Sequence, residues 1–93
     1  MVVGVVSWQL GLPGCGSLKE KRSVVRSLKE RLKHRFNVSV AETAHQDVLT
    51  RAELTVALVS PDRSFAQTAL DKIDRFVSGN GRAVVLDTYR EFY

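Results

Sequence analysis

Hydrophobic positions in the first part of the chain change from a period of two to the period of a helix. Met1–Leu12 is a β-branched run followed by alternation, which predicts a long strand with Trp8 in the core. Ser17 and Glu20 are spaced as a capping box, so we expect a helix at Leu18–Arg35. At about 100° per residue, its apolar positions fall on one core-facing stripe: Leu18, Val24, Val25, Leu28, Leu32 and Phe36.

The same two periods return in the second part. Asn37–Ala44 and Glu53–Val59 alternate and predict two strands, separated by a polar turn at residues 45–51. Ser60–Asp62 predicts a helix start, with the serine hydroxyl as cap and proline in the first helical position. The apolar stripe expected on this helix consists of Phe65, Ala66, Ala69, Leu70, Ile73, Phe76 and Val77.

The end of the chain completes the element order. Ser78–Gly81 predicts the helix end, where glycine or asparagine can adopt the left-handed conformation. Arg82–Tyr93 predicts a fourth strand that frays at Tyr89–Tyr93. The order β-α-β-β-α-β, with right-handed crossovers, predicts an α+β ferredoxin-like sandwich: one four-stranded antiparallel sheet with two helices on one face.

Length and composition agree with one small folded unit. The 93 residues are 44% hydrophobic and 26% charged, so we expect a single domain at 1–93. One cysteine excludes an intrachain disulfide and suits a reducing compartment. No apolar run is long enough to span a bilayer or to act as a secretory signal. We therefore expect a cytoplasmic protein without a membrane partner.

The positive charge of the protein is concentrated on the first predicted helix. Ser17–Phe36 carries eight basic and two acidic residues, whereas the rest of the chain carries six basic and eight acidic residues, for a net charge of +4. Five of the basic residues lie at consecutive angles beside the apolar stripe. We call them the basic ridge: Lys19, Arg22, Arg26, Lys29 and Lys33.

The basic ridge has two interpretations. Like charges four residues apart, such as Arg22 and Arg26, each cost a helix a few tenths of a kcal/mol, which favours a surface kept for binding anions. The alternative is a solvated face, or one neutralised by acids such as Asp71 and Asp74. An RNA-binding ridge would contact phosphates rather than bases, because the third strand lacks the aromatic residues of an RNA-recognition motif.

Other polar groups suggest weaker sites. Gly14, Gly16 and Ser17 could place backbone amides around an anion at the helix N-terminus, although the spacing of a nucleotide P-loop is absent. A phosphate-directed enzyme at this turn is a third hypothesis, and the lack of an arginine and asparagine set counts against it. Cys15 lacks an adjacent base and is expected to be a plain loop cysteine.

Glu42 and His45 also invite a chemical interpretation. Glu42 shares the parity of Val38 and Val40, so we expect it to point inward as a structural acid bonded to a basic residue or a backbone amide. With only two histidines, far apart in the chain, we expect no metal site and no cofactor.

The sheet face away from the helices, the open face, is a second candidate surface. If even-numbered strand positions form the core, the open face carries mainly small and apolar residues: Val3, Val5, Ser7, Ala41, Ala57, Val59 and Val85. Apolar surface left in water commonly marks an interface. A homodimer through this face, or through an edge strand, is therefore a hypothesis.

Three segments, in order along the chain, carry a family resemblance. Ser17–Arg22 reads SLKEKR, Phe36–Glu42 reads FNVSVAE, and Arg51–Glu53 reads RAE. The chain resembles the YlxP-like bacterial family of unknown function, which implies a ferredoxin-like fold. Genes of that family often lie beside genes for transcription elongation, translation initiation and ribosome maturation. The resemblance implies, by association, a role near RNA or the ribosome, and it carries over no catalytic residue.

The sequence thus predicts a non-enzymatic binding module. Its expected partner is structured RNA or the ribosome, contacted at phosphates by the basic ridge. The alternative is a homo-oligomeric scaffold or small-ligand sensor that assembles through the open face or an edge strand.

Overall fold

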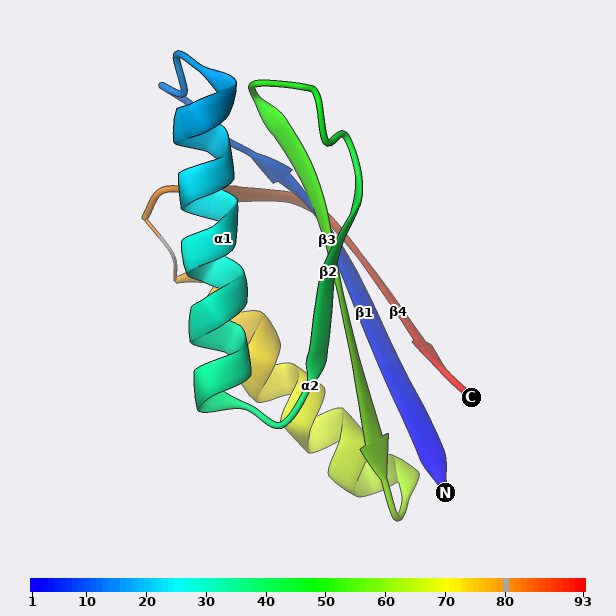
Figure 1. Ribbon diagram of the computed structural model, residues 1–93. Helices are drawn as coiled ribbons and strands as arrows, with labels where there is room; N and C mark the ends of the chain where they lie inside the picture. The colour runs from blue at the N-terminus through cyan, green and yellow to red at the C-terminus, as the bar shows by residue number, and fades with distance from the viewer. Residues whose placement is uncertain (80) are drawn as a thin grey trace.

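The computed structural model describes residues 1–79 and 81–93. Its elements are β1 (Val2–Gly11), α1 (Leu18–Arg35), β2 (Ser39–Ala44), β3 (Arg51–Ser60), α2 (Arg63–Ser78) and β4 (Val84–Phe92). The strands form one antiparallel sheet in the order β2-β3-β1-β4, and both helices cover the same face (Figure 1). This is the predicted α+β ferredoxin-like arrangement.

The core lies between the sheet and the two helices. The two central strands pair over ten residues, from Val2 opposite Ser60 to Gly11 opposite Arg51. Most of their inward positions are buried, and Trp8 among them donates from its indole Nε1 to Asp74 Oδ1 on α2 at 2.8 Å. The prediction that Trp8 is a core residue is confirmed.

The two helix starts differ in how well they were predicted. Ser17 caps α1 by accepting from the Glu20 amide at 3.1 Å, as expected. The cap of α2 is Asp62 rather than Ser60, because Asp62 Oδ1 accepts from the Phe65 amide at 2.8 Å. Ser60 is the last residue of β3 and α2 begins only at Arg63, so Ser60 and Pro61 precede the helix and occupy neither its cap nor its first position.

Three predictions for the second half are wrong in detail. Phe65 is 62% exposed, since it lies in the first turn of α2, outside the part that packs on the sheet. Val85 faces the core, because a β-bulge between Gln9 and Leu10 shifts the pairing and places Val85 opposite Leu10. The strand end does not fray: Tyr93 and Val3 exchange two backbone hydrogen bonds of 2.9 Å.

The helix α2 ends at Ser78, and Gly79 is its C-cap. Gly79 has φ −84°, so it does not adopt the left-handed conformation expected in this segment. Asn80, to which the same expectation applied, lies outside the described residues.

Candidate functional site

A buried lysine joins α1 to the sheet beside the basic ridge. The Lys21 side chain is fully buried, and its Nζ donates to the backbone oxygens of His45 and Gln46. The same Nζ lies 3.1 Å from Glu42 Oε2, an ion pair without hydrogen-bond geometry, since this buried oxygen accepts no hydrogen bond from the described residues. Lys21 therefore fixes the connection between β2 and β3 against α1. The expectation of a basic partner for Glu42 is confirmed.

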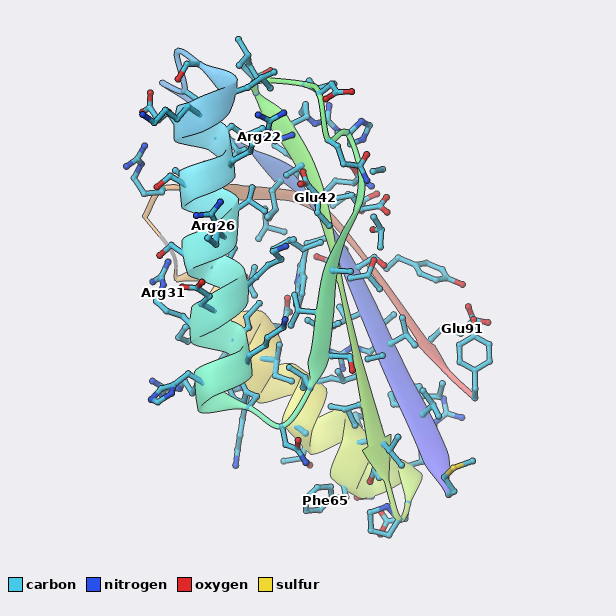
Figure 2. The ribbon with its side chains drawn as sticks, in the orientation of Figure 1. Arg22, Arg26, Arg31, Glu42, Phe65 and Glu91 are labelled. Atoms are coloured by element: carbon cyan, nitrogen blue, oxygen red, sulfur yellow. The ribbon has the colours of Figure 1, made fainter. Side chains whose placement is uncertain are left out.

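The basic ridge lies on the side of α1 that faces β2. Arg22, Arg26 and Lys29, with Val25 and Glu42, line a hollow of about 140 Å³ between the helix and this edge strand. Arg31 projects from the other side of the helix (Figure 2). Lys19 and Lys33 are exposed and extend the ridge at its two ends. The ridge spans 15 residues, about 21 Å of helix, a length that passes roughly six phosphates of one strand.

Three acids that could neutralise the basic ridge have other partners. Asp71 pairs with Arg90 at 2.8 Å, and Asp74 accepts from the Trp8 indole. Glu42, the acid in the hollow, is paired with Lys21. Among residues 1–79 and 81–93, the ion pairs do not include any ridge residue. The ridge thus keeps its positive charge on an exposed face.

The turn before α1 uses its amides internally. Gly14 has φ +83°, a conformation that favours glycine, and the Gly16 amide donates to Glu20 Oε2 at 3.2 Å. Glu20 is also paired with Arg82 at 3.0 Å. A ligand anion at Gly14, Gly16 and Ser17 would have to displace this carboxylate. Cys15 is a buried residue packed in the core.

The residues near Glu42 diverge rather than form a cluster. Glu42 points to the core side and contacts Lys21, whereas His45 Nε2 contacts Gln9 Oε1 at 3.2 Å on the open face. His45 itself adopts φ +65°. From Gln9 a polar network continues across the sheet through Glu53, Thr43, Thr55 and Ser7.

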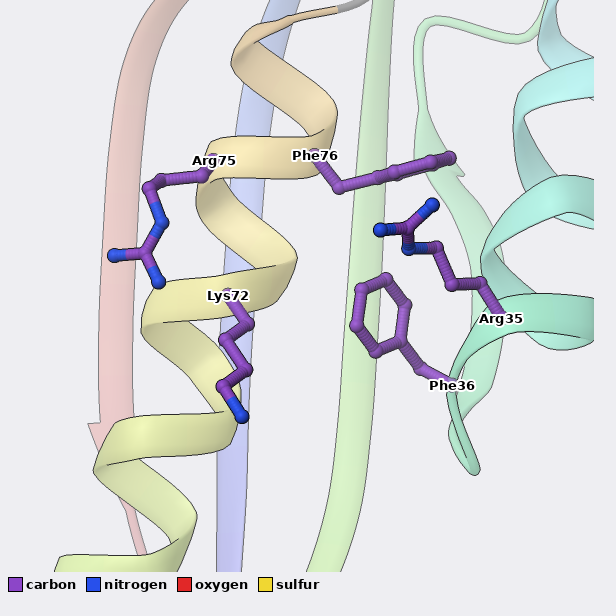
Figure 3. Close-up of a pocket in the computed structure, with 5 residues that line it drawn as sticks. All are labelled: Arg35, Phe36, Lys72, Arg75 and Phe76. Carbon is purple, nitrogen blue, oxygen red and sulfur yellow. The ribbon is translucent and has the colours of Figure 1, made fainter.

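The sequence analysis missed a second basic surface between the helices. Arg35 and Phe36 at the end of α1 meet Lys72, Arg75 and Phe76 of α2 around a pocket of about 370 Å³, which we call the interhelix pocket (Figure 3). The Phe36 and Phe76 rings contact edge to face, with centroids 5.7 Å apart. The sequence does contain a signal for this surface: an Arg–Phe pair lies near the C-terminal end of each helix, Arg35–Phe36 in one and Arg75–Phe76 in the other.

The open face has an apolar and a polar part. Near the chain ends it exposes Val59 (71%), Tyr89 (60%) and Tyr93 (69%). Hydrogen bonds from both tyrosines lower the pKa of Glu91, and the bond to the Glu91 carboxylate raises the pKa of each tyrosine. Tyr89, Glu91 and Tyr93 lie two residues apart, along β4 and the position after it, so they share the open face.

Neither helix of the described residues is both long enough and apolar enough to cross a bilayer.

Comparison with known sequences places the chain in a family. Residues 3–90 match the family described as "Protein of unknown function (DUF503)". The chain is 32% identical over 76 residues to the "Uncharacterized protein YlxP" of Bacillus subtilis (strain 168), an alignment that covers 82% of this chain and 83% of that protein. The resemblance inferred from the three sequence segments is thus confirmed, and the chain belongs to the DUF503 family.

Proposed function

We propose that this protein is a non-enzymatic RNA-binding module of the cytoplasm, whose basic ridge contacts the phosphates of structured RNA, including RNA of the ribosome. The observation that carries the proposal is that the basic ridge lies on an exposed face and its residues form no ion pair among the described residues. Arg22, Arg26 and Lys29 border one hollow whose acid, Glu42, is paired with Lys21, and the α2 acids Asp71 and Asp74 are engaged with β4 and β1. A solvated face kept only for stability would gain from acids interleaved with these bases.

The energetics of such a surface are electrostatic. Each phosphate contact releases bound counterions, so affinity falls steeply with salt. With about four contacts, raising salt from 50 to 200 mM would weaken binding about 150-fold. Phosphate contacts carry little sequence information, so we expect RNA shape to decide the target.

The experiment measures binding to purified ribosomal subunits and to bulk ribosomal RNA at about 50 and 200 mM salt. The test variant is Arg22→Glu/Arg26→Glu, and the matched control is Arg51→Glu/Arg63→Glu. Each pair lowers the net charge from +4 to 0. Saturable, salt-sensitive binding that only the ridge variant loses supports the proposal. Equal loss in both variants, or no binding by the folded wild type at low salt, contradicts it.

A homo-oligomer remains the second candidate, favoured by the open face. Val59, Tyr89 and Tyr93 expose most of their surface, and Val84 and Leu86 at the other end of β4 are about half exposed. A homodimer through this face would bury these side chains. Sedimentation at tens of micromolar tests it: a dimer that survives Arg22→Glu/Arg26→Glu supports this candidate, and a 10.4 kDa species alone refutes it.

A further inference from the structure

We propose that the interhelix pocket binds one unpaired nucleotide of an RNA strand, with the base against the Phe76 ring and the Arg35 guanidinium and the phosphate beside Lys72. The inference rests on the proposed function in one respect, the identity of the partner as RNA. It concerns a second surface, distinct from the basic ridge, and recognition of an RNA base rather than of phosphates alone.

The first observation is the arrangement of the two Arg–Phe pairs. The Arg35 guanidinium carbon lies 5.3 Å from the Phe76 ring centroid and 6.0 Å from that of Phe36 (Figure 3). The guanidinium plane is therefore already held among aromatic rings that are only partly buried. Planar cation and aromatic surfaces of this kind are those on which unpaired bases stack.

The second observation is charge. Arg35 and Lys72 bring two positive charges to a pocket with no carboxylate among its described lining residues, whereas the Arg75 side chain points away from Arg35 and the two rings (Figure 3). The C-terminal ends of the two helices contribute about half a negative charge each, which leaves roughly one positive charge. Asp71, the acid next to Lys72, is paired with Arg90. The pocket therefore attracts an anion.

The third observation is size and continuity. A volume of about 370 Å³ lies at the lower end of the range for small-molecule sites. A second hollow of about 410 Å³ shares Arg35 and Phe76 and continues to Arg31 and His34. The two hollows adjoin at the contact between Arg35 and Phe76. A strand could occupy both hollows, with one nucleotide in the pocket and its neighbour in the second hollow, whereas a free nucleotide would fill only one.

The experiment is an NMR titration of the ¹⁵N-labelled protein with three probes: adenosine monophosphate, ribose 5-phosphate and a short oligoadenylate. We expect saturable shifts at the five pocket residues, stronger for adenosine monophosphate than for ribose 5-phosphate because only the former has a base to stack. We expect the oligoadenylate to bind at least about tenfold more tightly than the mononucleotide, since it also occupies the adjoining hollow.

Two variants test separate parts of the pocket. Arg35→Glu/Lys72→Glu, which lowers the net charge as the ridge variant does, should weaken oligoadenylate binding more than tenfold. Phe76→Leu, which keeps an apolar side chain, should weaken adenosine monophosphate about tenfold and leave ribose 5-phosphate unchanged. The ¹⁵N spectrum of each variant reports whether it is folded, and Arg51→Glu/Arg63→Glu is the charge control.

Several results would overturn the inference. They are shifts that map to the basic ridge instead, equal binding of ribose 5-phosphate and adenosine monophosphate, or equal binding of mononucleotide and oligoadenylate. The basic ridge is tested separately with duplex RNA: binding that Arg22→Glu/Arg26→Glu retains contradicts the proposed function, and binding that this variant loses supports it. If the ridge variant loses duplex RNA binding and the wild-type protein does not bind oligoadenylate, the proposed function stands and this inference is wrong.

Discussion

Replacing Lys21 by methionine tests whether the buried lysine holds the β2–β3 connection against α1. Methionine keeps most of the aliphatic length and removes the ammonium group. The substitution deprives the backbone oxygens of His45 and Gln46 of their donor and leaves the Glu42 carboxylate, only 16% exposed, without its counter-ion. Three interactions of one buried group are lost at once.

The magnitude follows from those losses. Breaking a buried ion pair costs about 3–5 kcal/mol, and the slight exposure of Glu42 favours the lower end, about 3 kcal/mol. A 93-residue domain has a total stability of about 5–14 kcal/mol. The loss is therefore a large share of the total, and it should lower Tm by about 12–24 °C.

The assay is urea unfolding followed by the fluorescence of Trp8, the one tryptophan of the chain. Lys19→Met is the matched control, because Lys19 is an exposed lysine of the same helix, and it should stay within about 0.5 kcal/mol of wild type. The double variant Lys21→Met/Glu42→Gln should lose less free energy of unfolding than the sum of the losses in the two single variants, since it leaves no buried charge unpaired. A Lys21→Met protein as stable as the Lys19→Met control would refute the reasoning.

Two further predictions concern other buried or coupled polar groups. Asp74→Ala leaves the Trp8 indole without its acceptor and should cost about 1–3 kcal/mol in urea unfolding, whereas Asp74→Asn keeps an acceptor oxygen and should cost less. Glu91→Gln should return the pKa of Tyr89 and Tyr93 toward 10.0, measured by tyrosine absorbance, because the carboxylate that raises them is gone. The raised tyrosine pKa values stabilise the folded wild type below pH 10, and this stabilisation is lost as pH rises through the tyrosine pKa values of the folded state. The stability of the variant should therefore change less with pH in that range. An unchanged tyrosine titration would contradict the contact.

Periodicity predicted the fold because each element commits one face to a single core. Strand alternation and helical stripes are local properties, so the element order and the topology rules that follow from it were accessible. The errors arise where a local pattern meets a tertiary constraint. Val85 changes face because a bulge in the pairing of β1 with β4 shifts the register, and no residue pattern marks that bulge.

The candidate site was predictable only in part. The basic ridge follows from helical geometry alone, but its hollow with Glu42 depends on how α1 lies beside β2. Lys21 occupies the middle of the apolar stripe, a signal of a buried paired lysine that we did not use. The interhelix pocket joins residues about 40 positions apart, so it required the packing of the helices.

The most direct test of the central claim is the salt dependence of binding to a short RNA duplex. We would plot the logarithm of the association constant against the logarithm of the salt concentration for wild type, Arg22→Glu/Arg26→Glu and Arg51→Glu/Arg63→Glu. With about four phosphate contacts, the wild-type affinity should fall with a slope near −3.6, and the ridge variant should lose about two units of that slope while the equally charged control keeps it. Equal slopes in the two variants would contradict the account, because the ridge would then contribute no more than any other positive charge.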